Sequence, residues 1–128
     1  MKLILLTILA HLVADFTLQG WFCNGKQELW WKEECKRYGV DFYKYRNDYL
    51  MALFLHSLYW SIAILIPAMF MYNLPSEMIA LLLFLNTFLH FMTDDLKANR
   101  MVLNLVQDQI SHFIQIAVTL IIITNGIK

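Results

Sequence analysis

The sequence predicts an all-α fold: an integral membrane four-helix bundle with a short interfacial helix between the first and second spans. The chain is 59% hydrophobic and 15% aromatic, with only four Gly and two Pro in 128 residues, which is too apolar for an ordinary soluble domain of this size. It also contains four apolar windows close to the length of about 20 residues that a spanning helix needs. The expected spans are residues 3–19, 49–72, 77–96 and 103–124, within a single transmembrane domain over residues 1–128.

The first window, residues 3–19, could also be a secretory signal peptide, because Met1 and Lys2 precede an apolar run. However, His11 and Asp15 interrupt that run, and no small-x-small cleavage pattern follows it. We therefore expect this segment to be retained as the first membrane span.

The connection 20–48 is the one long polar section. It mixes six basic and five acidic residues with Trp, Tyr and Phe, a composition typical of segments at the headgroup level of a membrane. A short interfacial helix is expected around residues 26–37. Because the charges nearly cancel, attraction to phosphate backbones would be weak, so no nucleic-acid partner is expected. Cys23 and Cys35 lack the spacing of a zinc finger or a CxxC motif, and we expect free thiols.

The later helices have recognisable start signals. The break "YNLPSE" contains Pro75, and Ser76 is the expected N-cap of the third helix, with Glu77 in its first turn. Asn104 is expected near the start of the fourth helix in the same role.

The distribution of basic residues predicts the orientation. Eight of the ten Lys and Arg residues lie in the first and third connections, whereas the opposite side has only Lys2 and Lys128. By the positive-inside rule, both termini then face away from the cytoplasm. The expected location is the cell inner (cytoplasmic) membrane, as a multi-pass protein.

Each predicted span contains one of the four histidines, and three of these have an aspartate four residues away. Residues four apart on a helix lie one turn apart, separated by about 40° around the axis, and so share a face. Because lipid-facing surfaces are not built from such groups, these faces should point into the bundle. In an up-and-down arrangement, the seven groups converge at one depth, in the cytoplasmic leaflet. The candidate metal ligands are His11, Asp15, His56, His90, Asp94, Asp108 and His112.

Neutral imidazole and ionised carboxylate are ligands for a divalent metal ion, with zinc expected and iron or manganese as alternatives. The favoured ligands are His11, His90 and His112, joined by Asp15, Asp94 or Asp108. One of these three aspartates is the candidate catalytic group, as general base. Asp95 points elsewhere on the third helix and is expected to pair with Lys97 or Arg100.

The predicted function is a metal-dependent hydrolase acting on a lipid or lipid-linked substrate at the cytoplasmic leaflet. Two alternatives stay open: a proton- or ion-coupled transporter or channel component, and a phage accessory membrane protein with a structural metal. Membrane lipid is the expected partner, and a homo-oligomer is a further alternative.

Four segments, "AHLVADFTLQ", "LHSLYW", "LHFMTDDLKA" and "VQDQISHF", resemble the AHLxADFxLQ, LHxxxH-like, HFxxDxxK and DQxxH motifs of an uncharacterised family of small bacterial and phage membrane proteins. The motif order covers nearly the whole chain apart from the first connection. The chain is also distantly similar to membrane-bound metal-dependent hydrolases. One departure from the motifs is Trp60, which stands where a second histidine of the second helix is expected. The resemblance implies a membrane-embedded helical fold and names no substrate.

Overall fold

The computed structural model describes residues 1–17 and 19–126, and within this part the secondary structure is entirely helical. The all-α class is confirmed. Leu18 of the first predicted span and Lys128 of the orientation argument lie outside the described residues. The elements are α1 (Lys2–Leu12), the π-helical turn η1 (Val13–Thr17), α2 (Phe22–Gly25), α3 (Glu28–Tyr38), α4 (Phe42–Tyr45), α5 (Asp48–Met71), α6 (Ser76–Ala98) and α7 (Leu105–Gly126).

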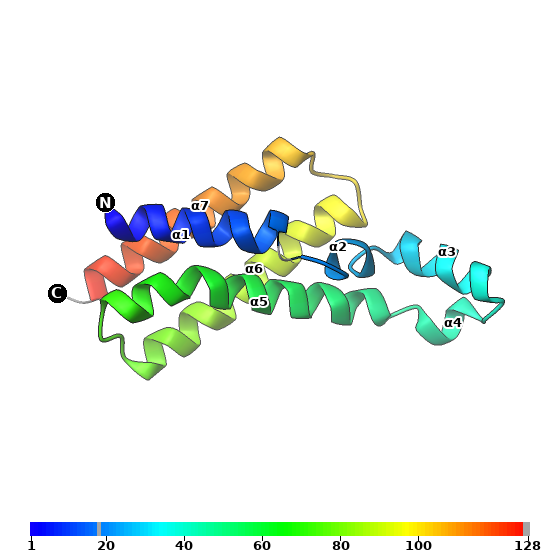
Figure 1. Ribbon diagram of the computed structural model, residues 1–128, viewed down its shortest axis with the longest axis horizontal. Coiled ribbons are helices and arrows are strands. Elements are labelled where there is room, and N and C mark those ends of the chain that lie inside the picture. Colours follow the sequence, from blue (N-terminus) through cyan, green and yellow to red (C-terminus); the bar gives the residue numbers. More distant parts are fainter. Residues whose placement is uncertain (18, 127–128) are drawn as a thin grey trace.

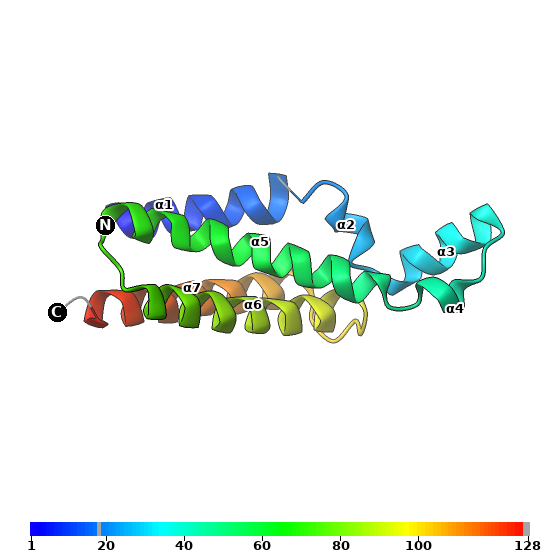
Figure 2. The same ribbon diagram turned by 90° about the horizontal axis from the view of Figure 1, so that it is seen from below.

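Four helices, α1, α5, α6 and α7, lie side by side, and each runs antiparallel to the one before it (Figure 1). Figure 2 shows two layers, α1 with α5 and α6 with α7. Helix α5 packs against both α1 and α6, and α7 packs against both α6 and α1. The start of α1, the last turn of α7 and the α5–α6 connection share one end. Helices α3 and α4 extend beyond the other end, which we call the polar end, and α2 packs against α5 near it.

Among residues 1–17 and 19–126, three helical segments are long and apolar enough to cross a membrane: Phe42–Met71, which contains α4 and α5, Ser76–Ala98 and Leu105–Gly126. The first predicted span is helical, but it is not among these three. Helix α1 has 11 residues and is therefore about 17 Å long, short of the roughly 30 Å hydrocarbon core of a bilayer. The chain then continues through the π turn η1.

The predicted helix starts are right for α7 and one residue late for α6. Asn104 Oδ1 accepts from the Gln107 backbone N–H at 3.0 Å, and Gln107 Oε1 accepts from the Asn104 N–H at 3.0 Å, a reciprocal capping pair. Ser76, in contrast, is the first helical residue, and Pro75 precedes it in an extended conformation. The Ser76 hydroxyl donates to Glu77 Oε2 instead of capping the backbone.

The predicted helix in the first connection is present as α3. It ends at Gly39, whose φ of 66° is in the left-handed region that favours glycine. The next residue, Val40, donates its backbone N–H to the Cys35 carbonyl at 3.0 Å. Cys23 and Cys35 are free thiols, as predicted.

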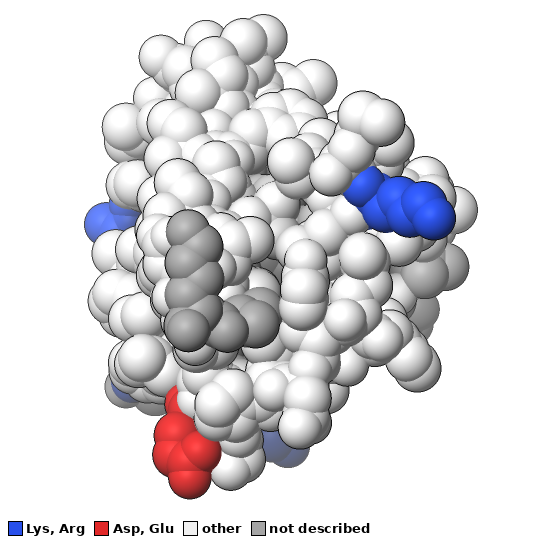
Figure 3. Space-filling view, turned by 90° about the vertical axis from the view of Figure 1, so that its left-hand side faces the viewer, with Lys and Arg blue, Asp and Glu red and all other residues white. Residues whose placement is uncertain are grey.

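The packed helices have an apolar half and a polar half. The apolar half lies toward the end that holds the start of α1, and its buried side chains include Leu3, Ile64, Leu65, Leu82, Ile116, Leu120 and Ile123. The surface of that end carries few charged side chains (Figure 3). The polar half lies toward α2 and contains the candidate site.

Candidate metal centre

The seven candidate ligands are buried, each with at most 3% of its surface exposed. They come from α1, η1, α5, α6 and α7, so the prediction that the polar faces of these helices point inward is confirmed. Buried polar residues on the same helices include Thr7, Ser57, Asn86, Gln115 and Thr119.

Six of the seven residues form three overlapping groups that could hold a metal ion, with the ligand atoms of each group within 4.8 Å of one another. Any two of the groups have one residue in common, which is His90, His112 or Asp15. A metal ion bound by one group would therefore lie close to the other two groups. The groups are Asp15 with His56 and His90, His90 with Asp94 and His112, and Asp15 with Asp108 and His112.

The separations between ligand atoms within these groups are equal to or slightly longer than those between neighbouring ligands of one ion. In a tetrahedral zinc site with bonds of about 2.0–2.1 Å, ligand atoms are about 3.3–3.4 Å apart. His112 Nε2 lies 3.4 Å from Asp94 Oδ1 and 3.3 Å from Asp108 Oδ1. His90 Nε2 lies 3.7 Å from Asp94 Oδ1. His56 Nε2 lies 3.7 Å from Asp15 Oδ1 and shares a hydrogen bond of 3.2 Å with His90 Nε2, which a metal ion in that group would replace. The donor set and its spacing therefore fit a divalent ion.

His112 is the clearest sign of an unmet bonding requirement. Its ring is fully buried, and neither Nδ1 nor Nε2 has a hydrogen-bond partner. Asp108 Oδ1, which faces Nε2, also has none. Because buried polar atoms are nearly always satisfied, an unpartnered imidazole nitrogen between two carboxylate oxygens indicates a place for a bound group.

Two lysines form ion pairs with carboxylates of the site, and sequence reasoning did not assign either lysine to it. Lys26 Nζ donates to Asp94 Oδ2 at 2.5 Å, and Lys97 Nζ donates to Asp108 Oδ2 at 2.6 Å. Each lysine contacts Oδ2, so Oδ1 of both carboxylates remains directed at His112. The charge on the lysines stabilises the ionised carboxylates that metal binding requires. Lys26 comes from α2–α3, where the sequence shows only an interfacial composition.

Of the two partners predicted for Asp95, Lys97 and Arg100, the structure pairs it with Arg100. Arg100 Nε donates to Asp95 Oδ2 at 2.7 Å, so the predicted Asp95–Arg100 pair is confirmed and Lys97 is used elsewhere. The hydrogen bond to Asp95 raises the pKa of the Arg100 guanidinium.

His11, a favoured ligand from the sequence, is in none of the three groups, and both of its ring nitrogens are bonded to side chains outside the candidate ligands. Nδ1 accepts from the Trp60 indole N–H at 2.8 Å. Since an indole can only donate, Nδ1 is unprotonated, and in the neutral ring Nε2 carries the hydrogen. Nε2 then donates to Gln109 Oε1 at 3.1 Å. His11 thus supports the cluster from outside, and His56 takes a place within it.

Gln109 forms hydrogen bonds with His11 and with the carboxylates of Asp15 and Asp108. Its oxygen accepts from His11, while its amide nitrogen donates to Asp15 Oδ2 at 2.9 Å and to Asp108 Oδ2 at 3.1 Å. The residue lies beside Asp108 within the "DQ" pair of the fourth motif, and this adjacency is the only signal in the sequence that could have indicated its role.

Trp60 separates the polar half from the apolar half. It is fully buried and belongs to the apolar core cluster. Its ring stacks on His90 with centroids 4.2 Å apart, and His90 stacks in turn on His112 at 4.3 Å. Trp60 therefore packs directly against one candidate ligand imidazole and, through it, against a second.

Asp15 lies in the π turn η1, directly after the last turn of α1, which contains His11. Asp15 Oδ1 lies 3.7 Å from His56 Nε2 on α5, while His11 Nδ1 accepts from Trp60. Such π turns are frequent at functional sites.

A pocket of about 430 Å³ opens at the polar end and reaches the cluster. Asp94 lines it, together with the two lysines that bind the carboxylates. Other lining residues are Gln19, Met101, Leu103 and Leu105. Among the candidate ligands, the pocket therefore touches the site at Asp94 alone.

Comparisons with protein-family models, with curated proteins and with solved structures give no match. Assignment of a function therefore rests on the geometry of the buried His/Asp groups and on the three apolar helices.

Proposed function

We propose that this protein is a membrane-bound, metal-dependent hydrolase whose metal ion lies between α6 and α7. The carrying observation is the buried His112 Nε2, without a hydrogen-bond partner and 3.3–3.4 Å from two carboxylate oxygens. His90, Asp94 and His112 are the proposed ligands, since Asp94 also lines the open pocket. Three protein ligands leave a coordination position open, as in catalytic zinc sites.

Zinc is the proposed ion, with iron and manganese as alternatives, because all three accept imidazole and carboxylate ligands. A divalent ion at this position would make water acidic enough to act as a nucleophile near neutral pH. Asp108 is the proposed general base, because its Oδ1 has no other partner. It would take a proton from the attacking water and pass it to the leaving oxygen as the ester or phosphoester bond breaks.

A lipid or lipid-linked substrate is proposed from the position of the pocket. In this proposal α1 and η1 form a fourth, short membrane helix, and α3 lies at the interface, with its Trp and Tyr side chains at the headgroup level. The polar end, with most Lys and Arg residues, faces the cytoplasm, and both termini face away. The sparsely charged opposite end supports this orientation (Figure 3).

The first test is elemental analysis of the detergent-purified protein, prepared without a histidine-rich tag, beside two matched variants. His112→Gln removes a proposed ligand, while His11→Gln removes an equally buried histidine outside the three groups. We expect about one equivalent of zinc in the wild type and His11→Gln, and well below that in His112→Gln. Equal metal content in both variants would overturn the ligand assignment.

The second test is hydrolysis of a chromogenic long-chain nitrophenyl phosphate ester by the zinc-loaded protein. We expect turnover that is lost in Asp108→Asn while the zinc content is kept. Zinc binding without turnover in any variant would favour a structural metal, as in a phage accessory protein.

The alternative of a proton or ion pathway is favoured by one observation, the chain of titratable groups in which Asp94, His112 and Asp108 connect Lys26 to Lys97. The buried Leu, Ile and Ala side chains beyond Trp60 oppose it, because they would have to be crossed to reach the other end. No metal in any sample would favour this alternative. Membership of the uncharacterised family that the four motifs resemble stays a prediction.

A further inference from the structure

We propose that the substrate is an amphiphilic phosphoester whose phosphate is bound by Lys26 and Lys97 and whose apolar chain lies in a groove between α6 and α7. This inference rests on the proposed function, because it takes the metal centre as given and names the chemistry of what reaches it. The inference uses two features that the proposed metal chemistry does not involve. They are the lysines that line the pocket and a separate groove on the lipid-facing side.

The lysines have donors left for a phosphate. Each ammonium group carries three N–H donors, and the ion pairs to Asp94 and Asp108 use one on each. Both lysines line the pocket at the polar end. Their remaining N–H groups can therefore contact an anion in the pocket without giving up the carboxylates.

The charge of the cluster makes this binding dependent on the metal. Three buried carboxylates and two ammonium groups leave one excess negative charge when the imidazoles are neutral, which would repel a phosphate. A divalent ion reverses the sign and leaves one excess positive charge. An anionic group is thus the ligand that the metal-loaded pocket favours.

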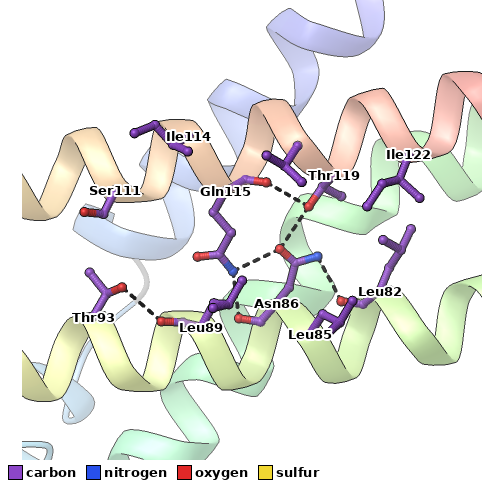
Figure 4. A pocket seen from close by; sticks show the side chains of 11 residues that line it. Leu82, Leu85, Asn86, Leu89, Thr93, Ser111, Ile114, Gln115, Thr119 and Ile122 are labelled. Atoms are coloured by element: carbon purple, nitrogen blue, oxygen red, sulfur yellow. Dashed lines mark hydrogen bonds between the residues drawn. The ribbon is translucent and has the colours of Figure 1, made fainter.

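The groove of about 300 Å³ runs along the α6–α7 contact (Figure 4). Most of its lining is aliphatic: Leu82, Leu85, Leu89, Ile114, Val118 and Ile122. The polar residues at its base bind one another. Gln115 Nε2 donates to Asn86 Oδ1 at 2.9 Å, and the Thr119 hydroxyl donates to the same oxygen at 3.0 Å.

The hydroxyl groups nearer the polar end are satisfied as well. Thr93 donates to the Leu89 carbonyl and Ser111 to the Gln107 carbonyl, both at 2.9 Å. Since these groups need no partner from outside, an apolar chain can cover them at little cost.

The groove and the pocket follow one another along the same helix contact. Thr93 lines the groove and Lys97 lines the pocket, and residues four apart on a helix lie one turn apart on the same face. The Lys97–Asp108 ion pair joins α6 to α7 at the pocket. A molecule with its chain in the groove would therefore present its head group to Lys97.

The test measures binding of dodecyl phosphate to the full-length, zinc-loaded protein in micelles by titration calorimetry, with inorganic phosphate as the probe that lacks the chain. Lys97→Gln should weaken dodecyl phosphate binding by about tenfold or more, the usual effect of losing one charge-assisted hydrogen bond. An unchanged affinity in Lys97→Gln would overturn the phosphate assignment.

The groove is tested with a bulky substitution and a matched control on the same helix. Val118→Trp fills the groove and should weaken dodecyl phosphate binding while leaving inorganic phosphate binding unchanged. Ile121→Trp, at an exposed position outside the groove, should change neither. Equal affinities of dodecyl phosphate and inorganic phosphate in the wild type would exclude the groove as the chain site.

Zinc is measured in the same samples, so that the two proposals can fail separately. Zinc present without dodecyl phosphate binding overturns this inference and leaves the metal centre standing. Absence of zinc from the wild type overturns the proposed function and removes the premise of this inference.

Discussion

The two halves of the packed helices are equally buried but are filled in opposite ways. Toward the start of α1, aliphatic side chains such as Ile64 and Leu82 pack together, each about 1% exposed. On the polar side of Trp60, four imidazoles and three carboxylates are buried to a comparable degree. Close packing meets the requirements of the first half, whereas the second half contains polar atoms that lack partners. The difference places the close-packed core in the apolar half and the candidate metal centre in the polar half.

The largest expected loss in the free energy of unfolding comes from removing the Lys26 ammonium group, which pairs with a buried carboxylate of the polar half. Lys26→Met leaves the buried Asp94 carboxylate without its ammonium partner, and breaking a buried ion pair in this way costs about 3–5 kcal/mol. We expect this loss in metal-free protein and a much smaller loss with zinc, because the ion supplies positive charge to the same carboxylate. Detergent-solubilised protein unfolded with and without zinc measures both values.

The control for this variant is Lys32→Met, which removes an exposed partner of Glu28. A surface pair of this kind contributes about 1 kcal/mol or less, and zinc should not change that value. If zinc fails to restore Lys26→Met, the carboxylate of Asp94 is not exposed to a metal ion and the comparison of the two halves loses its basis.

The parts of the molecule that the sequence predicted are those with a periodic pattern. Apolar windows and four-residue spacings located the helices α5, α6 and α7 and the inward direction of His90, Asp94 and His112. The parts that were missed depend on contacts between distant segments. Lys26 and Asp94 are 68 positions apart, and Lys26 looks like any basic residue of an interfacial segment.

The role of His11 was missed for a related reason. Periodicity places a histidine on a face, but it does not show whether another side chain already occupies its nitrogens. Trp60 and Gln109 occupy those of His11, and both come from other helices. The π turn at Val13–Thr17 had no signal in the apolar pattern, so the sequence predicted a longer regular first span than the structure has.

The apolar half should respond to substitution without reference to metal. Ile64→Ala creates a cavity in a tightly packed core, and we expect a loss of about 2–3 kcal/mol in the free energy of unfolding. In a membrane the cavity term dominates, because lipid is as apolar as the core. Unfolding in micelles should give the same loss with and without zinc, and the zinc content should equal that of the wild type. A lower zinc content would mean that the two halves are not independent.

Trp60 at the boundary tests how far the halves are coupled. Trp60→Phe keeps an aromatic ring against His90 but removes the indole N–H that His11 accepts. Loss of this buried hydrogen bond should cost about 1–3 kcal/mol, and it frees the ring of His11 to turn. We expect zinc affinity to fall less than in His112→Gln, because no proposed ligand is lost. The measurement is a zinc titration against a competing chelator, and a loss of affinity as large as that of His112→Gln would make Trp60 part of the metal centre itself.

The smallest expected effect is at the exposed start of α7. Asn104→Ala removes the side chain that caps the helix through Gln107, which should cost about 1 kcal/mol. The consequence should concentrate on the polar half, because Asp108 lies one turn into the helix and its backbone N–H donates to the Asn104 carbonyl. Fraying of this turn would move Asp108 away from His112 while leaving the core around Ile116 unchanged. We therefore expect slower hydrolysis at an unchanged zinc content, with Asn104→Asp as the control that keeps the cap. Equal rates in the two variants would show that the position of Asp108 is held by Lys97 and Gln109 alone.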